Sequence, residues 1–426
     1  MVRLGVDYGT STSKLVLRNP HASGGEKAFL LRHGNDFRVS SSVLFLNNEL
    51  HFGRFPNDRN SGTWFHSVKM RVAGEVTGDY KKYYYGTLSR LPTGITAQAL
   101  ATLTMWFLLT QARRNISRLL AGRAFRIAVT VGLPMSFYDD SFLRNAFLRI
   151  VAAARWLTDN CQPLDDKALS VDDARHFLFR VPPDVERGID GAEVREWIRS
   201  EAEAAMCLAV KSPAVADGPF AEIDVGAGTT NATVFSILPQ FIGRRWLKDR
   251  LGFFGAHSMP VGMDAIDDAI AKSENHSERN GVDYRGEEKQ FVSGSASPYQ
   301  DVLSGIRDAY LSAYQRGFRK FSIAEASSFR NHQVFITGGG SLLPAVTERF
   351  RKHASNYSDQ LKIRKLDVPL DFWDQNGKRV SQEDLTFLAA AYGLSFDAAE
   401  VPEADSPAQT RAAGMPERAR LNWEDM

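Results

Sequence analysis

The sequence predicts an α/β fold built from two halves of similar construction, and three observations lead to this prediction. In residues 4–17, LGVDYGTSTSKLVL, an apolar strand ends in Asp7, and a loop of small residues leads into a second strand. Residues 221–238, AEIDVGAGTTNATVFSIL, repeat this arrangement around Asp224, 217 residues further on. In residues 334–350, VFITGGGSLLPAVTERF, a β-branched strand enters three glycines that precede a helix. Alternating apolar residues define the strands, and the repeat at about half of the chain length predicts the two halves.

The loop after Asp7 is suited to hold an anion. Gly9 permits a backbone conformation that residues with a β-carbon avoid. Thr10, Ser11 and Thr12 add hydroxyl groups beside exposed peptide N–H groups. Taken alone, the loop also fits a polar hairpin turn capped by an aspartate, because Gly, Ser and Asp are common turn residues.

The loop after Asp224 offers the same chemistry. Its small residues are Gly226, Gly228, Thr229 and Thr230. Two such loops that face each other would clamp a polyphosphate and its metal ion. Magnesium keeps most of its waters and binds one or two carboxylates together with the phosphates. Asp7 and Asp224 are therefore the predicted metal ligands.

The third cluster, Gly338, Gly339 and Gly340, lets the backbone approach a flat ligand or a sugar closely. Ser341 follows and is predicted to be the N-cap of the next helix. Because glycines are common at turns, a strand-to-helix turn without a ligand is the alternative for this cluster alone.

Together, the segments GVDYGTSTS, EIDVGAGTTN and VFITGGGS resemble, in order and spacing, the two phosphate motifs and the adenosine motif of the actin-like ATPase superfamily. The resemblance spans nearly all of residues 1–396. It implies a two-lobed fold of duplicated ribonuclease-H-like domains, with an ATP cleft between the lobes. It also implies ATP or ADP as the bound nucleotide and Mg²⁺ as the cofactor, with Asp7 and Asp224 near the metal.

Within that superfamily, the sequence is most similar to the nucleotide-binding domain of the seventy-kilodalton heat-shock chaperones. Residues 39–54, VSSSVLFLNNELHFGR, resemble the family's early hairpin, whose turn would lie at Asn47 and Asn48. SVKMRVAG, residues 67–74, is similar to the segment that carries the catalytic lysine, which implies this role for Lys69.

Three later segments extend the similarity. SEAEAAMCLAV resembles the crossing helix that carries a glutamate near the attacking water, here Glu201. EEKQFVS resembles the segment that contacts the nucleoside, here through Lys289. LTFLAAAYGLSF, residues 385–396, resembles the helix that closes the fold. The implied catalytic residues are Asp7, Lys69, Glu201 and Asp224.

The resemblance also implies domain bounds. Lobe I would hold residues 1–205 and the closing helix near 380–396, and lobe II would hold residues 206–379. The segment 397–426 is rich in Ala, Pro, Glu and Arg and has few residues to bury. It is therefore predicted to be a disordered tail.

Three functions remain open on this scaffold. The first is a chaperone-like ATPase switch that acts with a separate protein partner or client, as the Lys69 segment implies. The second is a filament-forming ATPase, because VTVGLPMSFYDD, residues 129–140, resembles plasmid-segregating actin homologues, and this function implies self-association. The third is a small-molecule kinase, which is disfavoured because no sugar-binding residues are recognised. Beside the predicted metal site, Asn231 and Ala227 depart from the chaperone pattern.

The composition predicts a cytoplasmic protein without an affinity for membranes or nucleic acid. The 52 basic and 50 acidic residues leave a formal charge of +2, which does not favour polyanionic partners. The two cysteines, Cys161 and Cys207, form no C-x-x-C pattern, which is typical of a reducing compartment. The longest apolar stretch, residues 99–112, is too short to span a bilayer and predicts a core helix.

Overall fold

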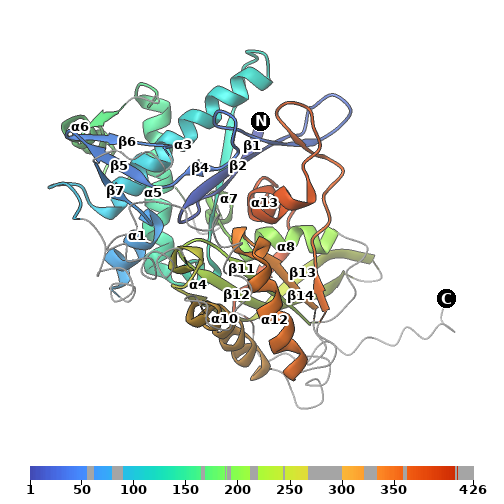
Figure 1. Cartoon of the computed structure of the whole chain (residues 1–426). Coiled ribbons are helices and arrows are strands. Elements are labelled where there is room, and N and C mark those ends of the chain that lie inside the picture. Colours follow the sequence, from blue (N-terminus) through green and yellow to red (C-terminus); the bar gives the residue numbers. More distant parts are fainter. Residues whose placement is uncertain are drawn as a thin grey trace.

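The computed structural model describes residues 1–54, 62–78, 90–164, 168–187, 189, 193–211, 219–242, 245–266, 300–320, 333–357, 362–407 and 410. This part of the chain is a mixed α/β fold that contains three β-sheets (Figure 1). Lys289 and most of the predicted tail lie outside the described residues.

The first sheet has seven strands. They are Val2–Asp7 (β1), Thr12–Asn19 (β2), Lys27–Leu30 (β3), Val39–Ser40 (β4), Ile127–Leu133 (β8), Ile198–Ser200 (β10) and Phe372–Asp374 (β16). The order is β10-β8-β1-β2-β3-β16, with β4 beside β2. Strand β1 pairs antiparallel with β2 and parallel with β8. Its alternating apolar residues, Val2, Leu4 and Val6, are all buried, as their period predicted.

The second sheet has six strands. They are Pro219–Val225 (β11), Thr230–Ile242 (β12), Arg245–Met259 (β13), Gln333–Thr337 (β14), Lys362–Arg364 (β15) and Glu403–Asp405 (β17). Strand β11 pairs antiparallel with β12 and parallel with β14. The order β13-β12-β11-β14-β15 matches β3-β2-β1-β8-β10 of the first sheet. The two sheets therefore share one strand pattern, and both hairpins predicted around the aspartates form.

A third, four-stranded sheet has the order β7-β5-β6-β9. Its strands are Val43–Leu46 (β5), Glu49–His51 (β6), Thr63–Phe65 (β7) and Leu169–Ser170 (β9). Asn47 and Asn48, between β5 and β6, have φ angles of 52° and 62°. Positive φ at both central residues is typical of a two-residue hairpin turn, which confirms the predicted turn.

The helices are Val68–Thr77 (α1), Ala97–Leu119 (α3), Met135–Asp139 (α4), Ser141–Asn160 (α5), Val171–Arg180 (α6), Val194–Trp197 (α7), Glu201–Lys211 (α8), Gln300–Phe318 (α10), Pro344–Tyr357 (α12) and Gln382–Leu394 (α13), with a 3₁₀ helix at Gly339–Leu342 (η3). Helix α3 is a core helix, as predicted for residues 99–112. No helix in the described ranges has the length and apolar character needed to cross a membrane.

Helices α8 and α13 lie between the two large sheets (Figure 1). Helix α13 packs against β1, β2 and β8 on one side and against β14 and η3 on the other. The two helices approach closely because Gly393 has no side chain; a Cβ there would collide with the carbonyl oxygen of Ala204. Helix α13 thus forms at the predicted closing segment, 380–396, and touches both sheets.

Two of the predicted domain bounds need correction. Strand β16, inside the range assigned to lobe II, pairs with β3 of the first sheet, because Phe372 and Val380 are buried in a cluster with Ala28 and Leu30. In the predicted tail, β17 adds a parallel edge strand to β13, and Val401 is buried just before it. Three-residue edge strands carry too little periodicity to be recognised in the sequence.

Candidate functional site

A cavity of about 250 Å³ lies where the ends of β1 and β11 approach each other. Residues from both hairpin loops, the glycine turn after β14 and helices α1, α8 and α13 line it. The predicted site residues that line this pocket are Asp7, Gly9, Thr10, Ser11, Thr12, Lys69, Glu201, Asp224, Gly226, Thr229, Gly338, Gly339 and Gly340. Residues far apart in the sequence therefore meet in one place.

Three predicted residues do not line the pocket, although each belongs to one of its loops. Thr230 donates a hydrogen bond from Oγ1 to the carbonyl oxygen of Val261 at 2.7 Å. Ser341 lies within η3 and donates from Oγ to the carbonyl oxygen of Gly338 at 2.7 Å, so it is not the N-cap of α12. That helix begins at Pro344, whose fixed φ suits the first helical position. Gly228 is also absent from the lining residues.

The first hairpin presents a charged pair to the pocket. Asp7 and Lys14 are directly opposed on β1 and β2, and Lys14 Nζ donates to Asp7 Oδ2 at 2.9 Å. Burial alone would lower the pKa of Lys14, but the carboxylates of Asp7, Asp224 and Glu201 raise it overall. The ammonium group is therefore charged. Lys14 was not predicted from the sequence. The register of the β1–β2 hairpin, which places Lys14 opposite Asp7, would have revealed it.

The second hairpin has the equivalent geometry with a neutral partner. Asn231 lies opposite Asp224, and its Nδ2 donates to Asp224 Oδ2 at 3.4 Å. Ser258 donates from Oγ to Asn231 Oδ1 at 2.7 Å, and Ser258 also shares a 2.6 Å hydrogen bond with Ser136 at the start of α4. Asn231, noted as a departure from the chaperone pattern, thus holds the carboxylate of Asp224.

Lys69 and Glu201 form a buried ion pair on one wall of the pocket. Lys69 Nζ donates to Glu201 Oε1 at 2.5 Å, and the two side chains are only 4% and 11% exposed. Burial raises the pKa of Glu201 to about 7, an effect that Lys69 opposes and that the charges of Asp7 and Asp224 increase. The structure thus joins two residues that are 132 positions apart.

The glycine turn lies against Asp224. Gly338 has φ 79° and ψ 163°, a backbone region that is essentially restricted to glycine. A Cβ at this position would also collide with Asp224 Oδ1 and with the carbonyl oxygen of Val225. The Gly338 amide donates to the carbonyl oxygen of Thr386 in α13 at 3.0 Å, which ties the turn to that helix.

A further buried acid, Glu222, lines the same pocket. It accepts hydrogen bonds from Thr337 Oγ1 to Oε1 at 2.8 Å and from Thr233 Oγ1 to Oε2 at 3.2 Å. Burial, and then the charge of Asp224, raise the pKa of Glu222 to about 8. Sequence reasoning missed Glu222 because a glutamate two residues before Asp224 is not distinguishable from a surface residue of a strand.

The ionisable side chains that line the pocket include both charge signs. They are Asp7, Glu201, Glu222 and Asp224 among the acids, and Lys14, Arg38 and Lys69 among the bases. Burial and the neighbouring carboxylate of Asp7 raise the pKa of Asp224, so a cation close to these acids would be favoured. Within the described ranges, no three His, Cys, Asp or Glu side chains are placed to hold a metal ion by themselves. Two carboxylates with room for waters and phosphate oxygens fit Mg²⁺.

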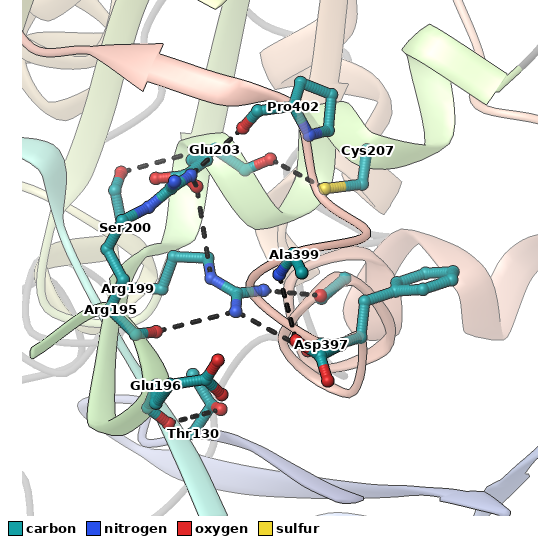
Figure 2. Close-up of polar contacts among 12 residues, drawn as sticks. Thr130, Arg195, Glu196, Arg199, Ser200, Glu203, Cys207, Asp397, Ala399 and Pro402 are labelled. Atoms are coloured by element: carbon teal, nitrogen blue, oxygen red, sulfur yellow. Dashed lines mark hydrogen bonds and ion pairs between the residues drawn. The ribbon is translucent and has the colours of Figure 1, made fainter. Parts of the chain in front are cut away.

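Figure 2 shows polar contacts of Arg195, Arg199 and Glu203 around the start of α8, a helix whose first residue is Glu201. The fully buried Arg199 donates to the carbonyl oxygens of Gly393 at 3.3 Å and Phe396 at 3.5 Å, at the end of α13. Glu203 forms an ion pair with Arg195. Arg199, in β10, also has its Nε 3.9 Å from Oε1 of Glu203 in α8. Together these contacts connect the start of α8, and with it Glu201, to α7 and to the end of α13.

Comparison of the sequence with protein-family models and with curated proteins finds no match.

Proposed function

We propose that this protein binds and hydrolyses ATP with Mg²⁺, and that it has the two-lobed actin-like fold, with duplicated ribonuclease-H-like halves and the nucleotide between them. The common strand pattern of the two large sheets supports the fold. The position of helices α8 and α13 between the sheets also supports it.

One observation carries the proposal. The hairpin loops after Asp7 and Asp224, the Lys69–Glu201 pair and the Gly338 turn line a single pocket, although they are far apart in the sequence. Each loop alone has an ordinary structural explanation as a turn. Their convergence, together with the positive charges of Lys14 and Lys69, favours a ligand that has several phosphate groups and a sugar or base.

The residues have distinct roles in this mechanism. Peptide N–H groups and hydroxyls of the two loops would hold the phosphates, and the charged Lys14 would reduce repulsion between the phosphates and Asp7. Mg²⁺, when bound through Asp7 and Asp224, would neutralise charge on the phosphate oxygens. Lys69 would stabilise charge that develops on the γ-phosphate, and Glu201 with Asp224 would orient the attacking water. Positioning and electrostatics supply most of the catalysis in phosphoryl transfer.

Hydrolysis would then act as a switch. A γ-phosphate held by both hairpins connects the two sheets, and its release removes that connection. The sheets would separate slightly around α8 and α13. We propose that a separate protein partner or client recognises this change, as in the chaperone-like function.

Filament formation is the second candidate. Phe142, in the first turn of α5, is 76% exposed and lies two residues after the segment that resembles plasmid-segregating actin homologues. In a filament, a second copy of the chain would bury this side chain. Sedimentation with ATP, ADP or no nucleotide separates the two candidates, because filaments pellet and a switch stays small.

The test of the proposed activity is phosphate release from ATP by the purified protein with and without Mg²⁺. We expect Mg²⁺-dependent release that Asp224→Asn lowers by about 100-fold, the scale of losing one electrostatic group at such a site. Thr158→Val, a change at a half-buried position near the end of α5 that does not line the pocket, serves as the control. Equal phosphate release from the parent, Asp224→Asn and Thr158→Val would contradict the proposal.

A further inference from the structure

Glu222 is a buried acid to which the proposed mechanism gives no part. It lies in β11, one of the two central strands of the second sheet, and is 2% exposed. Burying a carboxyl group costs free energy unless hydrogen bonds compensate, and an apolar residue would fill the same space without that cost. The group therefore requires an explanation other than packing.

The contacts of Glu222 connect three strands. Glu222 is directly opposite Thr233 of β12, and its Oε2 accepts a hydrogen bond from Thr233 Oγ1 at 3.2 Å. Its Oε1 accepts a hydrogen bond from Thr337 Oγ1 of β14 at 2.8 Å. Both threonines are buried. Glu222 and Asp224 share one face of β11, because successive side chains of a strand alternate between faces.

Thr337 connects this bridge to the pocket. It is the last residue of β14 and is paired with Asp224 in the parallel register. Gly338 follows at once, in contact with Asp224 and hydrogen-bonded to Thr386 of α13. Any movement of Thr337 along the sheet therefore moves the Gly338 turn relative to Asp224.

We propose that Glu222 is a positioning residue of the pocket, which holds the Gly338 turn against Asp224 through its hydrogen bond to Thr337. The inference rests on the proposed function, because the turn is assigned there to the nucleotide. Glu222 acts on the affinity for nucleotide and makes no contact with the reacting phosphate. Thr233 donates a hydrogen bond to the other carboxyl oxygen of Glu222 and keeps the group oriented.

Variants at Glu222 separate hydrogen bonding from size. Glu222→Gln keeps both bonds, because a threonine hydroxyl donates to the amide oxygen and accepts from the amide nitrogen. Glu222→Met keeps the volume and removes both bonds. We expect the Kd for ATP, measured by calorimetric titration, to rise about 10-fold or more in Glu222→Met and to stay within about 3-fold of the parent in Glu222→Gln.

A matched pair of threonine variants tests which of the two hydrogen bonds to Glu222 positions the Gly338 turn. Thr337→Val and Thr233→Val each remove one hydrogen bond to the same carboxyl group at a buried strand position. Only Thr337 adjoins the turn, so we expect Thr337→Val to weaken ATP binding about 10-fold and Thr233→Val to change it by less than about 3-fold. Equal effects of the two variants would overturn the proposal.

Hydrogen exchange of the free protein supplies a readout that needs no nucleotide. The Gly338 amide should exchange faster in Glu222→Met and Thr337→Val, and at the parent rate in Glu222→Gln and Thr233→Val. Parent-like exchange in Glu222→Met would overturn the positioning role. A parent protein that binds no ATP would instead refute the proposed function, while the exchange result would still decide the role of Glu222. If Glu222→Met does not fold, the threonine pair decides the question.

Discussion

Replacing Lys69 by alanine removes the cation of the buried pair with Glu201. Breaking such a pair typically costs about 3–5 kcal/mol when the remaining group stays charged. Here Glu201 has a pKa raised to about 7 by burial, even though Lys69 opposes the rise. Without Lys69 the pKa rises further, so the carboxyl group keeps its proton at neutral pH. At neutral pH we therefore expect Lys69→Ala to lose only about 1–3 kcal/mol of unfolding free energy, because a protonated Glu201 leaves no unpaired charge in the folded state.

The same reasoning predicts how the loss depends on pH. The pKa of Glu201 in the folded protein lies above its ordinary value of 4.5, so its contribution to stability is complete below about pH 4.5 and is lost as the pH rises toward 7. In Lys69→Ala this decline continues above pH 7. The difference in unfolding free energy between parent and variant should grow by about 1 kcal/mol between about pH 6 and pH 8.

Urea unfolding at three pH values in this range measures the difference directly. Met70→Ala is the matched control, because Met70 lies next to Lys69 on α1, is equally buried and carries no charge. Its loss of stability should be independent of pH. For activity, Lys69→Ala should retain ATP binding while turnover falls about 100-fold or more. A pH-independent loss of stability, or unchanged turnover, would refute this reasoning.

Three further predictions follow from the pocket and from the network beneath it. Gly338→Ala should raise the Kd for ATP by about 100-fold, because a Cβ collides with Asp224; calorimetric titration checks this. Asp7→Asn should reduce the gain in ATP affinity that Mg²⁺ produces, which titrations with and without Mg²⁺ measure; an unchanged gain would exclude Asp7 from the metal site. Arg199→Leu should lower the unfolding free energy by about 2–4 kcal/mol, since Glu203 loses a nearby cation and two buried carbonyl oxygens lose a donor; urea unfolding tests this, and a change below about 1 kcal/mol would contradict it.

The sequence predicted the parts of the fold that local patterns determine. Period-two alternation and the Gly loops located the hairpins around Asp7 and Asp224, and two consecutive asparagines located the turn between β5 and β6. The apolar stretch 99–112 also predicted a core helix, which lies within the longer helix α3. Strands β16 and β17 were missed because their formation depends on edge pairing with distant strands, which a three-residue segment does not reveal.

For the pocket, residue types were easier to predict than their interactions. Asp7 and Asp224 follow from their strand ends, but the partners Lys14 and Asn231 depend on the hairpin register. Glu222 depends on the burial of a whole sheet face, which requires the sheet and its covering helices to be known. Lys69 and Glu201 were each predicted from the family resemblance, but their 2.5 Å contact could be recognised only in the tertiary structure.

Calorimetric titration of ATP with Mg²⁺ into the purified protein tests the central claim most directly. The convergence of both hairpins, the two lysines and the Gly338 turn on one pocket predicts a single bound nucleotide per chain, with affinity that weakens strongly in Gly338→Ala. The absence of binding at millimolar ATP, or binding of equal strength in the variant, would contradict the assignment of this pocket to a nucleotide.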